Sequence, residues 1–141
     1  LRRLLESQKM TEQEAECIRI WDIRRFVESG LGQRMKKAAM KKHLYREQPF
    51  VIQRSASMLD DGWKNETVLV QGIIDAYFME EEEIVLVDYK TDRVKRGQEQ
   101  KLIDLYHVQL EDYARALERM TGKRVKEKII YSFTLQKEIL L

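Results

Sequence analysis

The chain has 141 residues, of which 26 are Lys or Arg and 24 are Asp or Glu, so its formal net charge at pH 7 is only +2. This balance is too even for bulk attraction to a polyanion, and no run of about 18 apolar residues could cross a membrane. A nucleic-acid site would therefore have to be local, and we expect no membrane contact. The length is typical of one domain with one hydrophobic core, so we expect residues 1–141 to form a single domain.

The cysteine content and the first residues indicate the setting of the protein. Cys17 is the only cysteine, so neither an intrachain disulfide nor a thiolate cluster is possible, and no signal peptide is recognisable. These features predict a cytoplasmic protein. The sequence begins with Leu1 in the middle of a charged and apolar pattern, and we expect it to be a fragment of a longer chain.

Residues 1–42 predict a helical leader. Thr11 and Glu14 have the spacing of a capping box, and the apolar residues that follow at helical spacing predict a helix over about residues 12–28. Ser29 and Gly30 then interrupt this pattern, and a second short helix with a basic face follows. Its lysines are interpreted as a solvated face, the commoner case, or as contacts to a DNA backbone.

Residues 43–135 predict a core of strands and one helix. Pro49 makes residues 43–54 an edge strand or a bulged strand. Residues 67–79 and 84–90 predict two strands joined through four glutamates, and the apolar run in the second is typical of a central strand covered on both faces. An amphipathic helix over 102–120, ending at Gly122, and a strand over 125–135 follow. The predicted fold is α/β (α+β), with helices flanking a central mixed β-sheet.

Two aspartates lie within the most apolar strands. If these strands form an antiparallel hairpin centred on residues 80–83, Asp75 lies opposite Asp88, with Lys90 on the same face. A shift of one residue would separate the faces, and the glutamates include no Gly or Asn to fix a tight turn. Directly opposed carboxylates destabilise a sheet unless a cation joins them.

A hard cation such as Mg²⁺ would satisfy this pair, because proteins often hold it with one or two carboxylates plus water and phosphate oxygens. The metal could polarise a phosphoryl oxygen and lower the pKa of a bound water, while Lys90 stabilises charge on the phosphate or positions the attacking water. The motif therefore predicts phosphodiester hydrolysis. Asp-x-Lys alone is a weak pattern, however, and Asp88 could simply cap the strand or pair with Lys90. Asp75, in a strand where propensity disfavours it, supports a site.

A third group of polar residues lies on the helix over 102–120. Tyr106, Gln109 and Tyr113 are three and four residues apart, so they share one helix face. Such a stripe is most often a core-facing surface, and the glutamine is its unusual member.

In combination, these motifs resemble the PD-(D/E)xK nucleases, and within them the RecB-type nuclease domains. GIID at 72–75 matches the first aspartate of that family, DYK at 88–90 its D-x-K motif, and QLEDY at 109–113 the Q-x-x-x-Y motif of the RecB-type group. Over about residues 12–135 the chain is similar, more narrowly, to the nuclease domains of the AddA family of bacterial helicase-nuclease proteins.

The resemblance implies a restriction-endonuclease-like core and a set of site residues. Asp75 and Asp88 would bind Mg²⁺, with Mn²⁺ as a possible substitute, and the carbonyl of Tyr89 would also face the metal. Lys90 would be catalytic. Gln109 and Tyr113 would support the active site and contact the DNA end.

The resemblance also implies a function. The chain would be a metal-dependent deoxyribonuclease, an exonuclease domain that processes double-strand DNA ends for recombinational repair. Its partners would be DNA, helicase domains of the same parent chain and an AddB-like partner subunit. The alternative, from another class, is a non-catalytic module that retains the nuclease fold to hold DNA or a partner.

One departure from the family concerns histidine. RecB-type nucleases usually have a metal-binding histidine on an upstream helix, and no residue here matches it. His43 begins a predicted strand and His107 points away from Gln109 around the helix, so we expect both to be ordinary polar residues. The missing ligand is expected upstream of Leu1, which would leave the isolated fragment with weak metal binding and low or no activity.

Three further residues lie in family motifs without an assigned role. Glu47 matches a recurring glutamate that could be structural or could support a metal ligand. Thr91 and Arg93 lie directly after the D-x-K motif.

Overall fold

The computed structural model describes residues 12–55 and 67–141, in which a five-stranded sheet lies between helices. The elements in chain order are α2 (Glu12–Glu28), α3 (Gly30–Met40), β1 (Leu44–Ser55), β2 (Thr67–Glu80), β3 (Glu83–Lys90), α4 (Glu99–Thr121), β4 (Val125–Ser132) and β5 (Lys137–Leu140). The strand order is β1-β2-β3-β4-β5, with β3 and β4 parallel and the other neighbours antiparallel. The predicted mixed sheet with flanking helices is confirmed.

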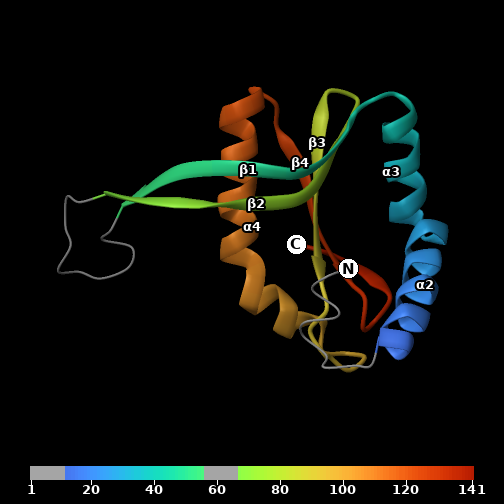
Figure 1. Cartoon of the computed structure of the whole chain (residues 1–141). Helices are drawn as coiled ribbons and strands as arrows, with labels where there is room; N and C mark the ends of the chain where they lie inside the picture. The colour runs from blue at the N-terminus through green and yellow to red at the C-terminus, as the bar shows by residue number, and fades with distance from the viewer. Residues whose placement is uncertain (1–11, 56–66) are drawn as a thin grey trace.

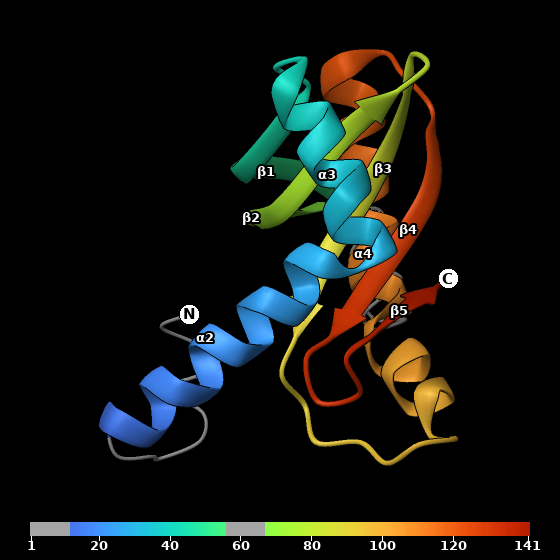
Figure 2. The same ribbon diagram turned by 90° about the vertical axis from the view of Figure 1, so that its right-hand side faces the viewer.

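The sheet separates two helical layers. Figure 1 shows α4 on one side of the sheet and α2 and α3 on the other, and Figure 2 shows α3 in front of the strands with α4 behind them. In the part of the chain that the structure describes, no helix is long and apolar enough to cross a bilayer.

Strand β3 lies at the centre of the sheet and is buried on both faces, as its apolar run predicts. Ile84 and Leu86 belong to the core under α4, which also includes Leu102, Leu110, Leu117 and Ile130. Val85 and Val87 belong to the core under the leader helices, with Leu31, Met35 and Tyr131. Successive residues of β3 therefore contact opposite layers.

The β2–β3 hairpin has the predicted register. Its pairs run from Glu80 with Glu83 to Ala76 with Val87. The two turn residues, Glu81 and Glu82, have φ angles of 49° and 71°. Positive φ at both central positions is the requirement of a type I′ turn, which glutamate meets at some conformational cost.

Ion pairs hold this acidic hairpin end against the rest of the fold. Arg34 of α3 lies 2.7 Å from Oε1 of Glu80, and it also pairs with Glu127 of β4. Hydrogen bonds from Arg34 are the main cause that lowers the pKa of Glu80 to about 2. Lys123 pairs with Glu82 at the turn itself.

The edges of the sheet differ from a regular ladder. Strand β1 is an edge strand that contains Pro49, as predicted. Glu47 has a φ of 49° between the regular pairs of Arg46 and Gln48, and β1 and β2 curve together along the sheet (Figure 1).

The single strand expected over 125–135 is wrong. Strand β4 ends at Ser132, and a turn in which Gln136 has a φ of 52° leads to the short antiparallel strand β5. The turn contains no Gly or Pro, so its residues gave no sequence signal for a break.

The corner between α2 and α3 requires a residue without a side chain, Gly32. The Ser29 hydroxyl donates to the Phe26 carbonyl and accepts a hydrogen bond of 3.0 Å from the Gly32 N–H. A Cβ at Gly32 would lie 2.1 Å from the Phe26 carbonyl oxygen and 2.8 Å from that of Val27. Both neighbours are backbone atoms, so the corner must open to admit any side chain.

We therefore expect Gly32→Ala to destabilise the chain by about 1–3 kcal/mol, the range of overpacking substitutions, and to loosen α2 from α3. Gly30→Ala is the matched control, because the nearest atom to a Cβ there is a carboxylate oxygen 3.9 Å away. Urea unfolding of the two variants measures the difference. Equal midpoints for both would contradict the close approach at Gly32.

Candidate active site

The two aspartates meet where the β2–β3 ladder ends. Its last backbone pair joins Ala76 and Val87, and the next residues along each strand are Asp75 and Asp88. There the backbone N–H of Tyr89 donates to Oδ2 of Asp75 over 3.0 Å. The carboxylate of Asp75 thus accepts the hydrogen bond that a main-chain carbonyl would accept in a continued ladder. Because Tyr89 follows Asp88 directly, this bond keeps the two aspartates close together.

Asp88 is a nearly buried carboxylate under α4, with 2% of its side chain exposed. Burial, a hydrogen bond shared with the Asp75 carboxyl and the charge of Asp75 raise the pKa of Asp88 to about 7, against the opposing charge of Lys90. Within the described residues, no well-directed hydrogen bond reaches its buried Oδ2, although Lys90 Nζ lies 2.8 Å away. One lysine therefore compensates this carboxylate only in part.

Lys90 is surrounded on several sides. Its Nζ donates to Oε1 of Gln109 over 2.9 Å and lies 3.9 Å from the ring centroid of Tyr106, besides its contact with Asp88. Its carbonyl accepts a hydrogen bond of 3.0 Å from the Phe133 N–H, just beyond β4. Both the backbone and the side chain of Lys90 are thus fixed.

The structure brings together the side chains of four predicted residues, Asp75, Asp88, Lys90 and Gln109, and places Tyr113 deeper. Gln109 reaches the cluster of Asp75, Asp88 and Lys90 from α4, through the hydrogen bond to Lys90. Tyr113 lies one turn further along, in the core, with its ring edge-on to that of Phe50 at 5.0 Å.

Tyr89 has its side chain on the opposite face of the sheet from Lys90. Its ring packs edge-on against Phe26 at 5.4 Å and is tilted against Phe133 at 5.8 Å. Burial in this aromatic cluster raises the pKa of Tyr89 to about 12, so its hydroxyl stays neutral. Only the main chain of Tyr89 can face the aspartates, through its N–H and carbonyl groups.

In the sequence, Tyr106 stands out only as part of the stripe on the helix, and Asp92 is not predicted to lie at the site. The Tyr106 hydroxyl donates to Oδ2 of Asp92 over 2.8 Å, while the ring contacts Lys90. The only sequence signal that Tyr106 belongs to the site is its spacing, since it precedes Gln109 by one helical turn. Asp92 lies in the segment after β3, where spacing predicts no contact.

The three residues without an assigned role lie on β1 and in the segment after β3. Glu47 lies on β1, between the residues that pair with Ile74 and Ala76 on either side of Asp75, and its side chain is exposed. The Thr91 carbonyl accepts a hydrogen bond of 3.3 Å from the Thr134 hydroxyl. Arg93 is exposed in the segment before α4.

Neither histidine joins the aspartates. His43 is exposed between α3 and β1, and the exposed ring of His107 has Nδ1 3.2 Å from the Ile103 carbonyl on its own helix. Among the described residues, no group of three or more His, Cys, Asp or Glu side chains is placed to hold a metal ion. The side-chain donors that the described part of the chain brings together at this site are therefore Asp75 and Asp88.

The chemistry of this pair fits a hard divalent cation. Both donors are carboxylates, the ligands that Mg²⁺ and Mn²⁺ prefer, and the buried Oδ2 of Asp88 lacks a well-directed hydrogen bond. A divalent ion would also remove the repulsion that raises the pKa of Asp88.

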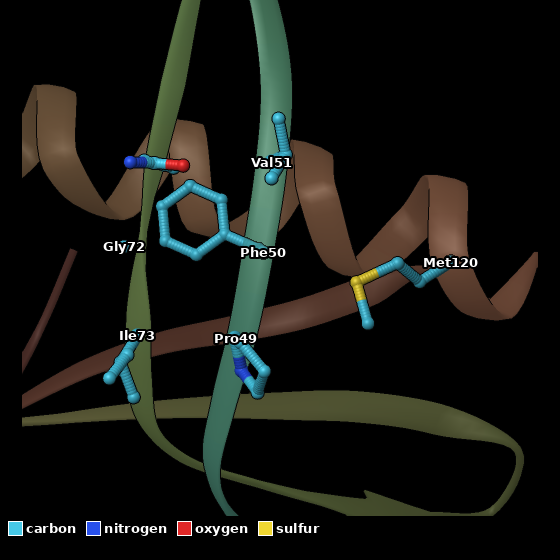
Figure 3. A pocket seen from close by; sticks show the side chains of 7 residues that line it. Pro49, Phe50, Val51, Gly72, Ile73 and Met120 are labelled. Carbon is cyan, nitrogen blue, oxygen red and sulfur yellow. The ribbon is translucent and has the colours of Figure 1, made fainter.

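A concavity of about 580 Å³ lies elsewhere, between β1, β2 and the end of α4. Figure 3 shows the ring of Phe50 reaching from β1 toward β2 at Gly72, with Pro49, Ile73 and Met120 around it. None of the described residues that line it is ionisable. It offers no group for hydrolysis, so the carboxylate cluster is the candidate active site.

An aspartate within one strand and an Asp-x-Lys on the next, in a mixed sheet between helices, define a class of nucleases. The chain belongs to the PD-(D/E)XK nuclease superfamily, whose family model matches residues 1–139.

The curated relatives that the chain matches are larger proteins. It is 38% identical, over 97% of its length, to an ATP-dependent helicase/nuclease subunit of Clostridium perfringens (strain 13 / Type A). The identity is 41% over 94% of the chain for the protein of the same name from Thermoanaerobacter sp. (strain X514), and 42% over 92% for that from Alkaliphilus metalliredigens (strain QYMF). The match covers 11% of each relative.

The raised pKa of Asp88 predicts a pH-dependent effect of Asp88→Asn on stability without metal. Because the folded chain holds this proton up to about pH 7 and the unfolded chain releases it near pH 4, wild-type stability falls as the pH rises between these values. Asn carries no such charge. We therefore expect Asp88→Asn to be more stable than wild type at pH 8, by on the order of 1 kcal/mol or more.

The comparison at pH 4 is the internal control, because Asp88 is protonated in the folded chain there and the gain should be much smaller. Urea unfolding at both pH values, with a chelator present, measures the two differences. A gain that is the same at pH 4 and pH 8 would contradict a proton held on Asp88.

Proposed function

We propose that this chain is a metal-dependent deoxyribonuclease domain that hydrolyses phosphodiester bonds. The observation that supports it most is the buried Asp88 beside Asp75, with Lys90 Nζ at 2.8 Å. In a purely structural role this arrangement would lower stability, since a second carboxylate raises the free-energy cost of burying the first. A site that binds a cation and a phosphate accounts for all three residues.

In this proposal Asp75, Asp88 and the carbonyl of Tyr89 hold Mg²⁺ or Mn²⁺. The bound ion supplies Lewis-acid polarisation of the phosphate and a more acidic water. The N–H of Tyr89 fixes Asp75 in its orientation through the 3.0 Å hydrogen bond. Lys90, held by Gln109, presents its ammonium group to a phosphate oxygen and stabilises the negative charge that develops in the transition state.

The role of Tyr113 in this proposal is indirect. Because its ring packs against Phe50 in the core, it sets the position of α4 on the sheet, and with it the position of Gln109 one turn earlier. A contact of Tyr113 with a DNA end would require the strand to reach between α4 and β1.

We propose further that the parent protein is a cytoplasmic bacterial helicase-nuclease that processes double-strand DNA ends for recombinational repair. The names of the relatives, which describe an ATP-dependent helicase/nuclease, support this. Helicase domains of the same chain would deliver unwound strand to an exonuclease site, and an AddB-like subunit would be the partner. The alternative is a non-catalytic module that holds DNA or a partner subunit.

Cleavage of linear DNA distinguishes these functions. We expect the parent protein, with its helicase domains, to degrade DNA when Mg²⁺ or Mn²⁺ is added and a chelator to stop it, and Asp88→Ala or Lys90→Ala in that protein to reduce the rate by at least about 100-fold. The physical reason is loss of a metal ligand or of the charge that stabilises the transition state. Release of labelled nucleotides measures the rate.

Lys123→Ala is the matched control, because this lysine pairs with Glu82 at the far end of β3 from the aspartates. It should retain the wild-type rate. If Asp88→Ala cleaved as fast as this control, the site assignment would be wrong. DNA binding without cleavage by every form, including a parent chain with its helicase domains, would support the alternative.

Metal binding is a separate test of the ligands. We expect Mn²⁺ to bind weakly, because a hard ion held by two side chains and otherwise by water exchanges readily, and Asp75→Asn to weaken it by about tenfold or more. His107→Ala should not change the affinity, because that ring faces solvent and its own helix. Calorimetric titration gives the constants. A loss of Mn²⁺ affinity in His107→Ala would show that His107 is a metal ligand, which contradicts its position in the structure.

A further inference from the structure

The ammonium group of Lys90 lies over the face of an aromatic ring. The distance from Nζ to the ring centroid of Tyr106 is 3.9 Å, well within the range of a cation–π contact, and only 11% of the lysine side chain is exposed. Partial removal of water strengthens such a contact. The ring therefore restricts the lysine from the side of α4.

The ring itself is fixed from outside the helix. The Tyr106 hydroxyl donates to Oδ2 of Asp92 over 2.8 Å, and burial, followed by this hydrogen bond, raises the pKa of Tyr106 to about 12. The hydroxyl thus remains a donor throughout the neutral range. Asp92 is held in turn by the Thr134 hydroxyl, which donates to its carbonyl over 2.7 Å.

The contact between Tyr106 and Lys90 matters because Asp88 can pair either with Lys90 or with a bound cation. A lysine side chain has four flexible methylene groups. If its ion pair with Asp88 were its only contact, the ammonium group of Lys90 would move whenever the Asp88 carboxylate moved. If Asp88 binds a cation, its hold on Lys90 weakens. Among the described residues, the ammonium group then still contacts Gln109 and the ring of Tyr106.

We propose that Tyr106, fixed by Asp92, is a positioning residue that holds Lys90 toward the phosphate site independently of Asp88. The catalytic consequence rests on the proposed nuclease function, whereas the placement of the lysine can be tested without it. Tyr106 acts through Lys90 and does not touch the reacting atoms.

The placement is measured by NMR on the 141-residue chain. In the wild type, the ε-methylene protons of Lys90 should be shifted upfield by the ring current and should show nuclear Overhauser contacts to the side chain of Gln109. In Tyr106→Leu we expect the upfield shift and the contacts to Gln109 to be lost, and in Tyr106→Phe to be retained. His107→Leu, the next residue on α4 with an exposed side chain, should match wild type.

The consequence is measured by DNA cleavage with the same substitutions in the parent protein. We expect Tyr106→Leu to lower kcat by roughly 10- to 100-fold with KM within about twofold, because misplacing a group that acts in the transition state affects kcat. Tyr106→Phe keeps the ring but loses one hydrogen bond, so we expect a fall of about 2- to 10-fold. Circular dichroism should show all variants folded.

The two arms separate the two hypotheses. Retention of the contacts between Lys90 and Gln109 in folded Tyr106→Leu would overturn the positioning role, whatever the nuclease result. An unchanged kcat in that variant, with an active wild type, would also overturn it and leave the nuclease function intact. A wild-type chain that shows the Lys90 signature, together with a parent protein that never cleaves DNA, would overturn the proposed function alone.

Discussion

The pairing of Lys90 with a buried carboxylate is the constraint on which the site depends. Asp88 is almost fully removed from water beside Asp75, and the ammonium group at 2.8 Å offsets only part of the cost, since the pKa of Asp88 remains raised to about 7. Because Lys90 compensates the two carboxylates only in part, a second positive charge beside Asp75 and Asp88 would be favourable. The same incomplete balance limits stability, and in the proposed function it links the affinity for a cation to the repulsion between the two carboxylates.

The mixed topology of the sheet brings this pair together with its supports. The antiparallel β2–β3 hairpin places Asp75 beside Asp88, which are near in sequence. The parallel pairing of β3 with β4 requires a crossover, and α4 is that crossover, so Gln109 returns over the face that carries Lys90. The carboxylates are thus joined by a local turn, and the lysine is fixed by a contact between distant segments.

The sequence predicted those parts of the site that follow from periodicity and symmetry. Alternation along β3 placed Asp88 and Lys90 on one face, and symmetry about the acidic turn predicted the register, although Glu81 and Glu82 offered no turn signal. The contact of Tyr106 with Lys90 could not be derived, because it depends on how α4 lies across the sheet. Strand β5 was missed since the turn before it contains neither Gly nor Pro.

Strand β3 also makes the leader helices part of the site. Because successive residues face opposite layers, Tyr89 lies between Asp88 and Lys90 in sequence, yet its ring packs on the α2 side against Phe26. The backbone N–H of the same residue donates to Asp75. Any movement of α2 that releases this ring would loosen the peptide that orients the carboxylate. The described part of the leader therefore stabilises the geometry of the aspartates from behind the sheet, through the contact of Phe26 with Tyr89.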